Sequence, residues 1–248
     1  MLEVSEDEAP PKRPTPVMAV PAAFAFAAVL HAAGLGQLSQ ILVGGTLHEV
    51  GHASAAVLGG RWAFFVPFAF TFTGQEASPV VVLGLVGGLL WFARWCWNER
   101  CWGFAVLCAL ALAGFVRLTV VASADEWRMW MVFSGCGGEL ALSALLVCAF
   151  FHPMPPILRW DFWRWPLMIA GALAFFEAFL WWQRMDPELR ATLGGDAVAR
   201  SRESDQDMVR LVREWRWTAA ELIRAYRALG AGGAAAIALN YAWAALRS

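Results

Sequence analysis

The sequence predicts an all-α integral membrane protein, a polytopic bundle of about six to seven transmembrane helices with a short membrane-edge β strand or hairpin and a cytoplasmic amphipathic helical segment. Of the 248 residues, 59% are hydrophobic and only 16% are charged. A soluble domain normally carries about 25% charged residues. Long apolar runs recur along the chain, and most of the 15 Trp gather near their ends. Indole rings favour the membrane–water interface, which supports these boundaries.

A helix needs about 20 apolar residues to span the hydrocarbon core. Six runs fit this length, and a seventh, rich in Ala and Gly, is a weaker candidate: 17–34, 37–58, 78–97, 102–121, 132–151, 166–183 and 229–246. We therefore expect four parts along the chain: a disordered tail at 1–16, a membrane core at 17–183, a cytoplasmic linker with amphipathic helices at 184–227, and a C-terminal segment at 228–248 that crosses the membrane or lies on its surface.

The distribution of Lys and Arg predicts the orientation in the membrane. Placing the N-terminus in the cytoplasm puts Lys12, Arg13 and the many arginines of 184–227 on that side, and leaves mainly Arg100, Arg159 and Arg164 on the other. Cytoplasmic loops carry the excess of positive charge, so this orientation is favoured. The net charge of −1 provides no basic field for nucleic acid, and the expected partner is the lipid bilayer.

Two stretches do not read as membrane spans. Residues 62–74 are rich in Phe and Thr and are interrupted by Pro67, which predicts a strand or hairpin at the membrane edge. Within 184–227, apolar residues recur at helical spacing from Met208 to Tyr226 among many charges. That pattern predicts a linker followed by amphipathic helices on the cytoplasmic face.

The strongest chemical signal is His48-Glu49-Val50-Gly51-His52, inside an apolar helix that Gly59-Gly60 would end. His48 and His52 are one helical turn apart, about 6 Å, so both imidazoles can bind one zinc ion. Glu49 is rotated by about 100° from His48 and would reach a water molecule on the metal. The motif therefore predicts a zinc centre with Glu49 as general base. Ionisable groups deep in an apolar helix are costly, which favours a functional role.

The run Gly-Gly-Thr-Leu-His-Glu-Val-Gly-His-Ala, followed by Leu58-Gly59-Gly60-Arg61, resembles the active-site helix of site-2-protease-like intramembrane metalloproteases, and within them the peptidase M50B-like membrane proteins. The aromatic stretch ending at Thr73-Gly74 is similar to the strand that follows this helix in such proteins. The run Ser134-Gly135-Cys136-Gly137-Gly138-Glu139 resembles their later small-residue motif, which opens a helix.

The resemblance also implies a third zinc ligand, an Asp far downstream that opens a helix and is followed four residues later by Leu. Asp207 with Leu211 matches this pattern, and Asp205 is the second choice. The alternative is that Asp207 is only the N-cap of an amphipathic helix. Substrate contacts are expected from Phe70 and Phe72 in the 62–74 strand, because an exposed strand edge can bind an extended peptide, and from Glu139.

Three other ionisable residues within or beside apolar runs are interpreted as structural. Glu177 lies in the middle of a predicted span, so we expect it to pair with another buried polar group. His31 and His152 are expected to be packed or interfacial histidines. None of the three is expected to bind zinc.

The sequence thus predicts an intramembrane zinc metalloprotease, a zinc metalloendopeptidase that hydrolyses peptide bonds of membrane-associated protein or peptide substrates. Two alternatives stay open. One is a catalytically silent zinc-binding membrane scaffold, which would have no use for the base Glu49. The other is a transporter that uses the His/Glu cluster, a class that often shows paired broken helices. No oligomeric state is predicted.

Overall fold

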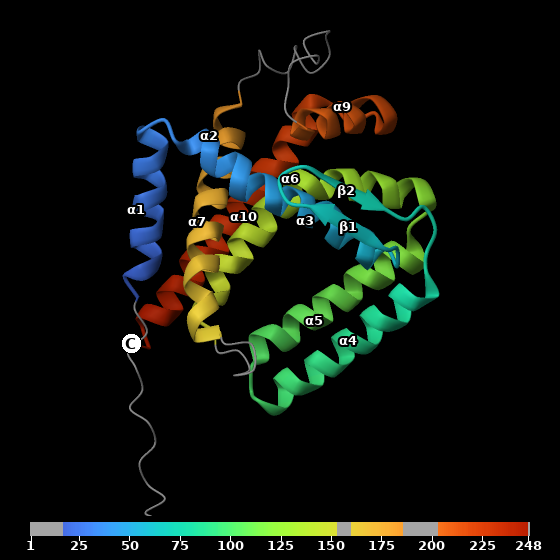
Figure 1. Ribbon diagram of the computed structural model, residues 1–248, viewed down its shortest axis with the longest axis horizontal. Coiled ribbons are helices and arrows are strands. Elements are labelled where there is room, and N and C mark those ends of the chain that lie inside the picture. The colour runs from blue at the N-terminus through green and yellow to red at the C-terminus, as the bar shows by residue number, and fades with distance from the viewer. Residues whose placement is uncertain (1–16, 153–159, 186–202, 248) are drawn as a thin grey trace, which may run out of the picture.

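The computed structural model describes residues 17–152, 160–185 and 203–247, with the side chains of 160 and 203–206 outside that description (Figure 1). The expected tail at 1–16 and much of the expected linker after residue 184 lie outside the described residues. The structure is a helical bundle with one small sheet, in agreement with the predicted fold class. Its elements are α1 (Ala19–Ala32), α2 (Gly36–Ser39), the π-helix η1 (Gln40–Gly44), α3 (Gly45–Leu58), β1 (Ala63–Val66), β2 (Phe70–Thr73), α4 (Pro79–Asn98), α5 (Trp102–Phe115), the π-helix η2 (Val116–Val121), α6 (Ala124–Ala149), α7 (Trp160–Arg184), α9 (Glu203–Trp215) and α10 (Ala219–Ala245).

Within the described residues, four helical segments are long and apolar enough to cross a membrane: α4, α5 with η2, α6, and α7 from residue 161. A bent pair, α1 with the segment 36–58, would add a fifth. This is consistent with a multi-pass membrane protein but is fewer than the six to seven predicted spans. The difference arises at α1–α3, where two predicted spans form one broken unit, and at α10, which does not belong to this apolar set.

The break between α1 and α2 is a bend of 118°. Gly34 adopts a left-handed φ of +77°, which a residue with a side chain rarely adopts. A Cβ on Gly36 would collide with the carboxylate of Glu177 on α7, so the missing side chain lets the turn lie directly against this carboxylate. The segment from α2 to α3 is therefore directed across the bundle, as Figure 1 shows, instead of running beside α1.

The bend changes the expected orientation of the N-terminal region. Helices α1 and α7 run parallel: Phe24 packs on Phe175, and further along both helices His31 contacts Glu177. The start of α1 and the end of α7 therefore lie at opposite ends of the bundle (Figure 1). The Lys and Arg counts placed both of these ends on the cytoplasmic side, whereas the structure puts the start of α1 and the end of α7 at opposite ends of the bundle.

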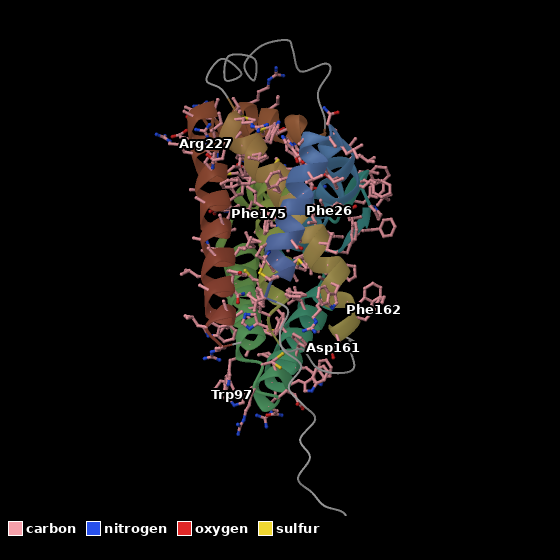
Figure 2. All side chains as sticks on the ribbon, turned by 90° about the vertical axis from the view of Figure 1, so that its left-hand side faces the viewer. Phe26, Trp97, Asp161, Phe162, Phe175 and Arg227 are labelled. Atoms are coloured by element: carbon pink, nitrogen blue, oxygen red, sulfur yellow. The ribbon has the colours of Figure 1, made fainter. Side chains whose placement is uncertain are left out.

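Different labelled side chains lie at the two ends of the bundle (Figure 2). Arg227 lies near the end that carries α9, and Trp97, Asp161 and Phe162 lie near the other end. Helix α9 carries Arg210 and Arg213, and α10 carries Arg224 and Arg227 near its start.

A β-hairpin follows α3, as predicted for 62–74. Gly60, with a φ of +71°, lies just beyond the last helical residue and lets the chain reverse. Strands β1 and β2 pair antiparallel, with Phe65 opposite Thr71 and Phe64 opposite Phe72. Both strands contact α3. The hairpin therefore lies directly on the helix that carries the His-Glu motif.

Helix α6 is the centre of the bundle and contacts α3, α7, α9 and α10. Half of its apolar window is buried inside the protein, against 6% for α4 and 11% for α5 with η2. The α4–α5 hairpin stands at the side of the bundle in Figure 1, with its surface left for lipid. Helix α10 continues without a break across the boundary expected at residue 228. Gly233 lets it pack closely against the ring of Phe175 on α7.

Candidate metal centre

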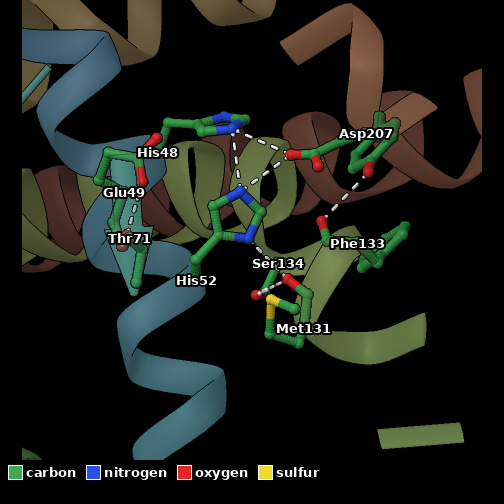
Figure 3. A network of polar contacts seen from close by, with 9 residues as sticks. His48, Glu49, His52, Thr71, Met131, Phe133, Ser134 and Asp207 are labelled. Atoms are coloured by element: carbon green, nitrogen blue, oxygen red, sulfur yellow. Dashed lines mark hydrogen bonds and ion pairs between the residues drawn. The ribbon is translucent and has the colours of Figure 1, made fainter. Parts of the chain in front are cut away.

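Three side chains from distant parts of the chain meet between α3 and α9 (Figure 3). His48 and His52 lie on α3, and Asp207 lies on α9. The His48 Nε2 atom is 3.1 Å from His52 Nε2, Asp207 Oδ2 is 3.1 Å from His48 Nε2, and Asp207 Oδ2 is 2.8 Å from His52 Nε2. This is the one group of His, Cys, Asp and Glu among the described residues that is arranged to hold a metal ion.

The three donor atoms lie close enough together to contact one metal ion. Zinc bonds to imidazole nitrogen and carboxylate oxygen are about 2.0–2.1 Å long, so neighbouring ligand atoms of a tetrahedral site lie about 3.3 Å apart. The three observed separations, 2.8 to 3.1 Å, are slightly shorter than that edge. Two nitrogens and one oxygen would occupy three corners and leave the fourth open, which is the donor set of catalytic zinc.

The hydrogen bonding of His52 supports a cation at this place. Its Nδ1 lies 2.7 Å from the carbonyl oxygen of Met131, and a carbonyl can only accept, so Nδ1 must donate. In the neutral ring, Nε2 then presents a lone pair to the Asp207 carboxylate. Two lone pairs 2.8 Å apart repel, so either a proton on Nε2 or a metal cation lies between them. The contact to Met131 is also the usual support of a metal-binding imidazole.

The imidazoles are placed by the close crossing of α3 and α6. A Cβ on Gly51 would collide with the carbonyl oxygen of Ser134, and one on Gly138 would collide with Gly51. A Cβ on Gly135 would lie 2.6 Å from atoms of both His48 and His52. The small-residue motif around 135 therefore lies mid-helix, where α6 backs the metal centre, and does not open a helix as its resemblance implied.

Asp207 reaches the centre because α9 is anchored on α6. Met208 and Leu211 are completely buried, and the Trp215 Nε1 atom donates to Asp125. Burial by itself raises the pKa of Asp207, but the hydrogen bonds and charges of His48 and His52 outweigh it and hold the pKa to about 2. The carboxylate is thus ionised at any pH at which it could bind a metal.

The expected third ligand is therefore brought to both imidazoles. Asp207 is the fifth residue of α9, which begins at Glu203, so it is not the N-cap that the alternative interpretation required. The side chain of the second choice, Asp205, lies outside the described residues. The 159 residues between His48 and Asp207 explain why neither spacing nor periodicity could place this ligand.

Glu49 is buried beside the centre, with 3% of its surface exposed. Its carboxylate does not contact the imidazoles directly: Oε2 accepts a hydrogen bond of 2.5 Å from the hydroxyl of Thr71 on β2. Figure 3 shows Glu49 beside Thr71, with Asp207 on the far side of the two histidines. The hairpin, predicted as a strand or hairpin at the membrane edge, is thus in contact with the candidate base.

The side chains expected to contact substrate lie elsewhere. Phe70 and Phe72 are 44% and 55% exposed, and they alternate with Thr71, so they point away from Glu49. Their role as substrate contacts stays a prediction, and the residue of β2 that contacts Glu49 is the threonine between them. Glu139 is buried on α6 and accepts a 2.6 Å hydrogen bond from Gln40 Nε2 of the π-helix η1.

The remaining ionisable residues behave as expected. Glu177 pairs with His31 at 2.9 Å and joins α7 to α1. His152 Nε2 accepts a hydrogen bond from Asn240 Nδ2, and its ring stacks on Trp243. These contacts are packing interactions between helices, and neither histidine belongs to the metal centre.

Comparison of the chain with protein-family models, with curated proteins and with solved structures finds no match in any of the three. The chemistry of the centre therefore has to be inferred from the arrangement of its own residues. Three of these had not been singled out for any role in the centre: the Met131 carbonyl, the Thr71 hydroxyl and Gly135 as a contact of both imidazoles. A backbone carbonyl and a contact across two helices leave no pattern along the sequence.

Proposed function

We propose that this protein is a zinc-dependent endopeptidase that cleaves membrane-associated polypeptides, of the site-2-protease-like type that its His-Glu motif resembles. The observation that carries the proposal is the triangle of His48 Nε2, His52 Nε2 and Asp207 Oδ2, with Glu49 on the same helix as the two histidines. A purely structural metal site would have its fourth position filled and would need no neighbouring carboxylate.

Two imidazoles and one carboxylate suit zinc better than magnesium or calcium, which prefer all-oxygen sites. When bound there, a zinc ion would supply Lewis acidity that makes a water molecule more acidic and polarises a substrate carbonyl. His48, His52 and Asp207 would hold it. Met131 would keep the ring of His52 in the tautomer whose Nε2 faces the metal.

Glu49 would move the protons of the reaction. Its carboxylate takes a proton from the attacking water while the new bond forms between the water oxygen and the peptide carbon. The same carboxyl group then gives this proton to the leaving nitrogen as the C–N bond breaks. The products are one carboxyl and one amino terminus, so a single group serves first as base and then as acid.

The surroundings of Glu49 indicate the class of substrate. His48, Glu49 and His52 are at most 8% exposed, and they lie in a helix of the bent pair that is apolar enough to enter a membrane. A peptide bond in an intact transmembrane helix is shielded by its own hydrogen bonds, so the substrate must be locally unwound. The β1–β2 hairpin offers strand edges that could hold such an extended segment.

The test is cleavage by the purified full chain in detergent with zinc. The probe is a synthetic single-span peptide with a fluorophore and quencher on either side of a Gly-Pro break in its apolar stretch. Wild type should contain about one zinc per chain and cleave the peptide. Glu49→Gln should keep the zinc and lose at least about 1000-fold in kcat.

Glu76→Gln, an exposed acid in the loop after β2, is the matched control and should behave as wild type. Full cleavage by Glu49→Gln would overturn the mechanism. A wild-type protein that binds no zinc would overturn the metal assignment, and one that binds zinc without cleaving any probe would favour the silent scaffold.

A further inference from the structure

The face of the hairpin turned toward α3 carries two threonines. Along β2, exposed Phe70 and Phe72 alternate with the less exposed Thr71 and Thr73, as the two-residue repeat of a strand requires. The Thr71 hydroxyl lies 2.5 Å from Glu49 Oε2 and 3.0 Å from the carbonyl oxygen of the same residue. One side chain of β2 is therefore in contact with both the carboxylate and the backbone of the candidate base.

This contact limits the orientations of Glu49. A hydroxyl has one proton, so Thr71 shares it between two acceptors and favours the nearer, Oε2. The glutamate side chain has three rotatable bonds, and a buried carboxylate needs a donor. A hydrogen bond to Oε2 therefore restricts the rotamer that Glu49 adopts beside the two histidines.

We propose that Thr71 is the positioning residue of Glu49, through which the β1–β2 hairpin sets the orientation of the base. This inference rests on the proposed peptidase function. Thr71 belongs to the two-stranded hairpin and Glu49 to α3, so the packing of the hairpin on α3 holds the base in one orientation.

A comparison of Thr71 with Thr73 distinguishes positioning of the base from simple support of the fold. Thr73 points to the same side of β2 two residues further on, yet no hydrogen bond joins it to Glu49 in the described structure. Valine has nearly the shape of threonine and lacks only the hydroxyl. Thr71→Val and Thr73→Val therefore make the same change on one strand, and only the first removes a contact to the base.

The first experiment measures kcat, KM and zinc content of the purified full chain with the quenched single-span peptide. Thr71→Val should lower kcat by about 10- to 100-fold, with KM within about threefold and zinc unchanged, because a hydrogen bond to a charged group and the alignment of a catalytic group are lost. Thr71→Ser should restore at least a third of wild-type kcat, and Thr73→Val should match wild type. A wild-type kcat in Thr71→Val, or a Ser variant as slow as the Val variant, would overturn the proposal.

A second measurement needs no turnover. The hydroxamate of benzyloxycarbonyl-leucine binds zinc and gives a proton to a neighbouring base, so its affinity reports whether Glu49 is aligned. Glu49→Gln and Thr71→Val should each weaken binding at least fivefold, and Thr71→Val should add less than twofold in the Glu49→Gln background. If the losses of hydroxamate affinity in the two single variants multiply in the double variant, Thr71 and Glu49 act independently and the proposal is contradicted. If wild type binds zinc and the hydroxamate but cleaves no peptide, the peptidase function fails while this cycle still decides the role of Thr71.

Discussion

Substitution of Gly135 by Ala is a stringent test of the metal centre, because the change is far from the His-Glu motif in sequence. The added Cβ would lie 2.6 Å from Cε1 and Nε2 of His48 and from Cε1 of His52, which is about 0.8 Å inside the 3.4 Å of ordinary contact. Both rings must move by about that distance or α6 must move away. Metal–ligand distances tolerate only about 0.2 Å, so we expect zinc to bind at least about 100-fold more weakly, a loss of about 2.8 kcal/mol.

The assay is a competition between the purified variant and a chromogenic zinc chelator, with the melting temperature measured in parallel. Gly137→Ala is the matched control on the same helix, because its Cβ would approach only the movable rings and methyls of Phe133 and Leu229, at 3.1 to 3.5 Å. Gly137→Ala should bind zinc within about threefold of wild type. Wild-type zinc affinity in a well-folded Gly135→Ala protein would refute the description of α6 as the wall behind both imidazoles.

Three further outcomes are expected. Asp207→Ala should weaken zinc binding at least about 100-fold, whereas Asp205→Ala should leave it within about threefold of wild type. Equal zinc affinity in both variants and wild type would refute the assignment of Asp207 as the third ligand. Glu177→Gln should lower the melting temperature by several degrees without changing zinc content, because the partly buried pair with His31 at 2.9 Å is lost; an unchanged melting curve would show that this pair does not hold α1. Thr218→Ala should lower the stability of the start of α10 by about 1 kcal/mol, because it removes the capping box. The measurement is the rate of amide hydrogen exchange in the first turn of α10, which should increase.

Much of the local structure could be read from the sequence. The helix of the His-Glu motif ends at Leu58 as Gly59-Gly60 predicted, and the Phe- and Thr-rich stretch forms the predicted hairpin. Glu177 does pair with another polar group. These features depend on neighbours within a few residues, where glycine conformation, strand alternation and the cost of burying charge act directly.

The orientation of the N-terminal region could not be read in the same way. Counting apolar runs treats each as one full crossing, so every run reverses the direction of the chain. Gly34 and Gly36 instead let α1 and α2 meet at 118°, and α1 ends up parallel to α7. Nothing in the composition of the apolar runs distinguishes a straight crossing from a bent one, because the decisive contact, Gly36 against Glu177, lies across 141 residues.

By itself, the sequence determined the helical membrane character of the chain and the pair of imidazoles one turn apart with a carboxylate between them, because both follow from local apolar content and from the helical repeat. Only the tertiary structure decided that Asp207 completes the triangle, that Thr71 and not Phe70 or Phe72 faces Glu49, and that Gly135 lies against both rings. These are contacts between surfaces of different elements. They depend on how closely α3, α6, α9 and the hairpin pack. Between α3 and α6, the close approach is possible because Gly51, Gly135 and Gly138 have no side chains.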